Sequence, residues 1–250
     1  MNQHYIRGVR LSTPVEKNSY LQTLPAVQAL AAGPGLEFTR DVTFFVGENG
    51  TGKSTLLEAI AVAYGFNAEG GSRNFSFSTK STHSGLCNHL TLSRGAVPRD
   101  GFFLRAESFY NAASYLDKLD EGPLGERLLP LYGGVSLHDQ SHGESFLALV
   151  RNRFRGRGLY ILDEPEAALS PSRLLSLLVC LHDLVENHSQ FLIATHSPIL
   201  MAYPGAQILQ LSEQGIAPVA YRDTEHYQLT RRFLEDPEGM MHRLFEEDES

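Results

Sequence analysis

Short apolar runs alternate with helical patterns along most of the chain. The runs Val42 to Val46, Leu159 to Leu162 and Phe191 to Ala194 are continuous, as is typical of strands buried on both faces of a parallel sheet. Residues 54–64 and 171–185 carry apolar side chains at helical spacing. This alternation predicts an α/β domain with a largely parallel sheet, whose ligand lies at the carboxyl ends of the strands.

Weaker patterns flank this central part. Residues 5–11 alternate like a half-exposed strand, and residues 208–211 and 217–221 predict a hairpin around Gln214-Gly215. A final helix is expected around residues 224–234. Residues 70–94 are rich in Ser, Thr, Gly and Asn with little apolar period, so we expect a loop region there.

Composition limits the class of protein. The 250 residues, with 42% hydrophobic and 20% charged, suit a single α/β domain over 1–250. A net charge of −8 gives no global sign of nucleic-acid binding. Two distant cysteines fit reduced thiols and a cytoplasmic location. No apolar run approaches the roughly 20 residues of a membrane span, so no membrane insertion is expected. Residues 235–250 are expected to form an acidic C-terminal tail, in which residues 246–249 are solvated and frayed.

The strongest chemical motif follows the first buried run. Gly47-x-x-x-x-Gly52-Lys53-Ser54 lies between a predicted strand and a predicted helix, the context that a phosphate-binding P-loop needs. Its glycines let successive N–H groups point at one anion, while Lys53 supplies positive charge to the β- and γ-phosphates of a nucleotide. Ser54 can bind the magnesium ion. The predicted nucleotide-binding residues are Glu48, Asn49, Gly50, Thr51, Gly52, Lys53, Ser54 and Thr55.

Two later strands end in reactive side chains. Asp163 and Glu164 close the second buried run, and His196 follows the third. Beside a P-loop, Asp163 is expected to orient magnesium and Glu164 to polarise the attacking water. His196 is expected to hydrogen-bond the γ-phosphate and that water. The alternatives are two exposed acids at a strand end and a capping or packing histidine.

Order and spacing of these motifs resemble the ATP-binding cassette (ABC) ATPases over about residues 36–215. Gly47–Ser54 resembles the Walker A motif, and Leu159–Glu164 resembles Walker B with its catalytic glutamate. Ala168–Ser170 is similar to the D-loop and Thr195–Ser197 to the switch-histidine region. The resemblance implies a P-loop NTPase fold of ABC type. Such a fold has a mostly parallel central sheet flanked by helices, a smaller antiparallel β portion, and a helical subdomain, here about 108–158, that carries the signature motif.

The signature departs from the transporter pattern Leu-Ser-Gly-Gly-Gln. The chain has Gln140-Ser141-His142-Gly143-Glu144 instead, with His142 in place of a glycine. Glu144 at the last position is more similar to the ATPase heads of SMC, RecF and related DNA-maintenance proteins than to transporters. Overall, the chain resembles small stand-alone bacterial ATPases of this class. No clear Q-loop glutamine exists. Glu107 is the candidate substitute, which would join Ser54 and Asp163 at the metal, with a surface acid as the alternative.

The family resemblance also implies cofactors and partners. It implies ATP and Mg²⁺, and an ATP-dependent homodimer in which Ser141, Gly143 and Glu144 of one copy act on the ATP of the other. A further protein partner is expected but its identity stays open. The alternatives are an energy-coupling subunit of a membrane transporter, a nucleic-acid-linked switch supported only by the arginines over residues 151–157, and a P-loop kinase. A kinase would leave His196 and the signature region without a role.

Overall fold

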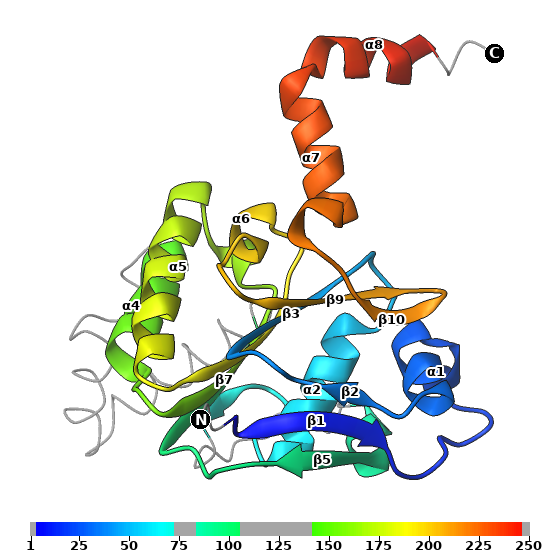
Figure 1. The fold of residues 1–250 in the computed structure, drawn as a ribbon, viewed down its shortest axis with the longest axis vertical. Coiled ribbons are helices and arrows are strands. Elements are labelled where there is room, and N and C mark those ends of the chain that lie inside the picture. The colour runs from blue at the N-terminus through cyan, green and yellow to red at the C-terminus, as the bar shows by residue number, and fades with distance from the viewer. Residues whose placement is uncertain (1–3, 73–83, 106–141, 247–250) are drawn as a thin grey trace.

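The computed structural model describes residues 4–72, 84–105 and 142–246 (Figure 1). Within these ranges the main sheet has seven strands in the order β10-β9-β3-β8-β7-β6-β4. Its five central strands run parallel to one another, and the short edge strands β4 and β10 are antiparallel to the strands that they pair with. Their bounds are β3 (Val42–Val46), β4 (Gly71–Ser72), β6 (Asp100–Arg105), β7 (Gly158–Asp163), β8 (Gln190–Ala194), β9 (Gln207–Ser212) and β10 (Gly215–Pro218). The prediction of an α/β fold with a largely parallel sheet is confirmed.

A second, antiparallel sheet pairs β1 (Ile6–Leu11) with β2 (Leu36–Glu37) on one side and with β5 (Leu90–Arg94) on the other. It matches the smaller antiparallel portion that was expected. The prediction of a loop over residues 70–94 was wrong for β5. Its ladder partner lies about eighty positions earlier in the chain, so the local composition gave too weak a signal for a strand that long-range pairing stabilises.

Helices cover both faces of the main sheet. On one face, α2 (Lys53–Tyr64) and α1 (Pro25–Ala32) share an apolar core with Ile161 and Leu192. On the other face, α4 (His142–Arg153) and α5 (Pro171–Glu186) pack against Tyr160 and Ile193 (Figure 1). Successive residues of β7 and β8 therefore point into opposite cores. Burial on both faces explains why these strands are continuous apolar runs.

Two helices at the end of the described chain project from the body (Figure 1). They are α7 (Glu225–Glu235), which confirms the predicted final helix but has no buried residue, and α8 (Pro237–Glu246). Residues 237–246 of the expected acidic tail thus form a helix, while residues 247–250, where fraying is expected, lie outside the described ranges. Proline suits the first position of a helix, and Met240, Met241, Leu244 and Phe245 follow it at helical spacing.

Of the predicted helical subdomain over about 108–158, the structure describes α4 and the residues after it. Across the described ranges, no helix is both long enough and apolar enough to cross a membrane.

Candidate active site

The loop between β3 and α2 has the backbone conformation of an anion cradle. Gly47, Gly50 and Gly52 all have positive φ, at 137°, 82° and 92°. A side chain at Gly47 would collide with the carbonyl oxygen of Leu211 on β9, so the close approach of that strand requires glycine. A Cβ at Gly50 would meet nothing within 4 Å, and this side of the loop is open to a ligand.

Lys53 lies inside this cradle. The side chain is 4% exposed, and its Nζ donates to the carbonyl oxygens of Gly47 at 2.8 Å and Glu48 at 2.9 Å. Burial lowers the pKa of Lys53, and the carboxylates of Glu164 and Asp163 act in the opposite direction. Lys53 is therefore within electrostatic reach of both acids at the end of β7, although about 110 residues separate them in the chain.

A second cation lies beside Asp163. The register of β6 and β7 pairs Arg105 with Asp163, and Arg105 Nε is 3.4 Å from Asp163 Oδ2. Arg105 Nη1 also contacts Glu58 Oε2 on α2 at 2.5 Å. The guanidinium thus joins the end of the sheet to the helix that follows the P-loop. It also offsets the charge of two acids that are largely buried.

Glu164 has a strained backbone. Its φ of 50° and ψ of 52° lie in the left-handed region, which costs a non-glycine residue about 1–2 kcal/mol. Its N–H donates to the carbonyl oxygen of Ala194 on β8 at 3.0 Å, which holds this turn against the neighbouring strand. The Glu164 side chain remains 40% exposed. Strain of this kind persists where the surrounding structure imposes it, and active sites are a common location.

His196 faces Glu164 from the end of β8. Its Nε2 is 3.7 Å from Glu164 Oε1 and has no hydrogen-bond partner among the described residues. Its Nδ1 lies 2.8 Å from Nε2 of His226 on α7. Its backbone N–H donates to the carboxylate of Glu166 at 2.5 Å. The ring is thus fixed on one side, while Nε2 points toward the side chain that is expected to act on water.

Burial, with the positive charge of Lys53 and the neighbouring His226, lowers the pKa of His196 to about 4. Burial and Lys53 also lower the pKa of His226. Both rings are therefore neutral at pH 7, and one N–H lies between them. When His226 donates it, His196 carries its own proton on Nε2, the nitrogen that faces Glu164.

Two family models match these two halves of the site. A model described as "AAA domain" matches residues 33–94, which include the P-loop. A second, described as "AAA domain, putative AbiEii toxin, Type IV TA system", matches residues 131–202, which include Asp163, Glu164 and His196. Both matches are to AAA-type domains, and together they support an ATPase of this class.

Three solved structures are similar to this chain at low sequence identity. The ATPase is similar to CbiO1 from Clostridium perfringens, part of the ABC transporter complex CbiONQ, at 16% identity and a TM-score of 0.50, covering 97% of this chain and 99% of that one. It also matches an SMC head domain from Thermotoga maritima at 17% identity and a TM-score of 0.41, covering 74% and 93% of the two chains. A third match is an ATP-binding cassette of an ABC transporter, at 16% identity and a TM-score of 0.47, covering 86% and 91%.

Part of the predicted signature of this ATPase is described. Gly143 and Glu144 lie in the first turn of α4, and Glu144 Oε1 forms an ion pair with Arg173 Nη2 on α5 at 3.0 Å. A Cβ at Gly143 would lie 3.0 Å from the carbonyl oxygen of Ala168, so the signature packs against the predicted D-loop of the same chain. Ser141 lies outside the described residues.

The metal prediction is only partly covered, since Glu107 also lies outside the described residues. Ser54, in the first turn of α2, and Asp163 supply oxygen atoms, the donors that Mg²⁺ prefers. No cluster of three His, Cys, Asp or Glu side chains that could hold a metal occurs in the described ranges. The two oxygen donors of Ser54 and Asp163 fit an ion whose coordination is completed by substrate phosphates and water, as is general for magnesium in ATPases.

Two residues at the site of the ATPase were not predicted, Arg105 and His226. Arg105 ends an apolar run, as Asp163 does. Knowing that the two strands are neighbours would have placed Arg105 at the same edge of the sheet. His226 follows His196 by thirty residues with no motif between them, and α7 alone brings it close. The arginines over residues 151–157 do not act as one patch. Arg153 Nη1 binds Asp100 Oδ1 at 2.8 Å, while Arg157 lines a separate cavity.

Lowering the pH should destabilise the nucleotide-free ATPase through the histidine pair. Because the pKa values of both histidines are lowered in the folded protein, the unfolded chain binds more protons than the folded chain as the pH falls. This stability is complete above the ordinary histidine pKa of about 6.5 and is lost as the pH falls toward the folded value. His226→Gln removes one such group and one cause of the low His196 pKa. We expect a shallower pH dependence of the free energy of unfolding between pH 7 and 5.

Urea denaturation of the wild type, His196→Gln, His226→Gln and the double variant at several pH values measures this effect. Contact between the rings makes the two substitutions non-additive. A wild-type pH slope in His226→Gln would contradict the pairing.

Proposed function

We propose that this ATPase hydrolyses ATP between two copies of the chain, with Glu164 activating the attacking water. The observation that carries the proposal is the convergence of Lys53, Asp163, Glu164 and His196 from three parallel strands on one edge of the sheet. ATP would lie with its phosphates in the P-loop, and its γ-phosphate would point toward Glu164 and His196.

Glu164 is the base in this proposal. Its carboxylate takes a proton from water as the water oxygen attacks the γ-phosphorus, and the bond to the bridging oxygen breaks to release ADP. Its side chain is partly exposed, whereas Asp163 is buried against Arg105. This difference supports the division of roles, in which Asp163 and Ser54 hold magnesium. The metal would supply positive charge to the β- and γ-phosphates.

His196 would orient the water and the γ-phosphate through Nε2–H. A neutral imidazole can donate there without the cost of a buried charge beside Lys53. His226 would act on His196 as a positioning residue, because the hydrogen bond between the rings fixes the tautomer.

A second copy would complete the site. Gly143 lies in the first turn of α4 and packs against Ala168, four residues after Glu164. These segments form one surface that could meet the ATP of a facing copy. The N-terminal end of α4 would direct its positive dipole at the γ-phosphate. ATP would then join the two chains, and hydrolysis would release them.

The test is the association state of Glu164→Gln, which should bind ATP without cleaving it. Light scattering after size-exclusion chromatography should detect a dimer with ATP and Mg²⁺ and a monomer without them. Glu164→Gln combined with Lys53→Met is the control and should stay monomeric. A Glu164→Gln protein that binds stoichiometric ATP and stays monomeric would rule out the sandwich arrangement.

A further inference from the structure

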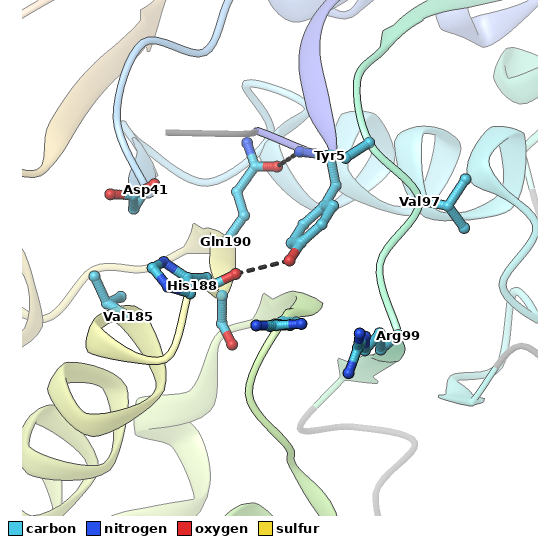
Figure 2. A pocket seen from close by; sticks show the side chains of 10 residues that line it. Tyr5, Asp41, Val97, Arg99, Val185, His188 and Gln190 are labelled. Carbon is cyan, nitrogen blue, oxygen red and sulfur yellow. Dashed lines mark hydrogen bonds between the residues drawn. The ribbon is translucent and has the colours of Figure 1, made fainter. Parts of the chain in front are cut away.

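A cavity lies at the edge of the sheet opposite Asp163 and Glu164. It has a volume of about 440 Å³, and its lining includes Tyr5, Asp41, Arg99, Arg157 and His188 (Figure 2). Asp41, Arg157 and Ser189 immediately precede β3, β7 and β8, so the cavity lies at the amino ends of these parallel strands. The P-loop, Glu164 and His196 follow their carboxyl ends.

Two arginines give this cavity positive charge. The backbone N–H of Arg99 donates to the carbonyl oxygen of Arg157 at 2.9 Å. This bond joins the two loops that carry these side chains. In the part of the chain that the structure describes, neither guanidinium forms an ion pair. Both charges reach the Tyr5 hydroxyl, where they oppose the rise in pKa that burial causes. Asp41, the acid in the lining, is 3.3 Å from His4 Nε2.

The cavity wall contains backbone strain. Among the described residues, three that are not glycine have positive φ: Glu164, Arg157 at 58° and His188 at 62°. Two of the three line this cavity. Arg157 N–H donates to the carbonyl oxygen of Asn187 at 2.7 Å, next to His188. Strain held in this way marks ligand clamps and active sites, and Glu164 is an example in the same chain.

The floor is rigid before any ligand binds. Gln190 is 1% exposed, and its Oε1 accepts from the backbone N–H of Tyr5 at 2.8 Å and of Ile6 at 2.9 Å. Tyr5 Oη donates to the carbonyl oxygen of His188 at 2.8 Å (Figure 2). These bonds fix the strand β1 against the start of β8. A preformed pocket loses less entropy when it binds a ligand.

We propose that this cavity binds a small phosphate monoester, with the phosphate at Arg99 and Arg157 and the organic part against Val97 and Val185. Two guanidiniums match the roughly double negative charge and the three terminal oxygens of a phosphate monoester better than the single charge and two oxygens of one carboxylate. The volume is within the range of pockets for small ligands. The site is separate from the P-loop and does not depend on the proposed hydrolysis.

Isothermal titration calorimetry tests this proposal, with the P-loop first saturated by Mg²⁺ and a non-hydrolysable ATP analogue. The probes are AMP, inorganic phosphate and succinate. We expect AMP to bind more tightly than inorganic phosphate, and succinate to bind least. Arg99→Gln combined with Arg157→Asn should weaken AMP binding at least tenfold, because the phosphate would lose its charged hydrogen bonds to both guanidiniums. Asparagine is chosen because it tolerates the left-handed conformation of residue 157.

Arg151→Gln combined with Arg155→Gln removes the same charge from nearby exposed positions and should leave AMP affinity within twofold. If this control variant lost as much AMP affinity as the Arg99 and Arg157 double variant, the effect would come from overall charge, and the proposed site would be wrong. Succinate binding as tight as AMP binding, or absence of AMP binding at millimolar concentration, would also overturn it. Arg99→Gln alone repeats the test if the double variant does not fold.

Discussion

Glu164→Gln should lower the rate of ATP turnover by about 10²–10⁴-fold, the usual contribution of a general base. Glutamine keeps the size of the side chain and its hydrogen bonding but cannot accept a proton. Lys53 and the P-loop are untouched, so the affinity for ATP should stay within a few-fold of the wild type. Single-turnover measurement of phosphate release, with the affinity measured separately by a fluorescent nucleotide, separates the two quantities.

The matched control is Glu186→Gln, an exposed acid at the end of α5 and the opposite edge of the sheet. Its turnover should equal that of the wild type. If Glu164→Gln keeps more than a tenth of the wild-type turnover, the base must be another group. Glu166 is then the next candidate, because burial raises the pKa of its carboxyl and its Oε1 lies at the backbone of His196.

The parts of the site that sequence predicts are those that local physics determines. The P-loop is encoded in one short segment, because the glycines, Lys53 and the start of α2 act on each other within eight residues. Asp163, Glu164 and His196 follow buried runs, and parallel strands necessarily place their carboxyl ends at one edge. The convergence of these groups could therefore be predicted before strand order was known.

The remaining features depend on pairing over long distances. Arg105 reaches Asp163 only because β6 lies beside β7, and the sequence around Arg105 does not indicate that pairing. His226 reaches His196 from α7, an exposed helix with no buried residue. The strand β5 is similarly stabilised by β1 rather than by its own composition. Such contacts are properties of the tertiary arrangement, and a single sequence carries little signal for them.

Lys53→Met should weaken ATP binding about a hundredfold or more. The ammonium group is the cation inside the cradle, and it lies near Asp163 and Glu164. Without it, the negative phosphates would approach these two carboxylates with one less cation nearby, although Arg105 remains beside Asp163. The charged hydrogen bond from the third ammonium N–H to phosphate, which contributes roughly 1.5–3 kcal/mol, would also be lost. Methionine keeps most of the apolar stem, so the packing around α2 should survive.

The stability of the nucleotide-free protein separates this effect from misfolding. Lys53→Met leaves the carbonyl oxygens of Gly47 and Glu48 without their donor, but it also removes a buried charge. Because these two consequences oppose each other, the thermal midpoint without nucleotide should change much less than the ATP affinity. Lys17→Met, at an exposed position, should change neither quantity. If Lys53→Met bound ATP within threefold of the wild type, the P-loop lysine would not contact the phosphates, and the orientation proposed for ATP would be wrong.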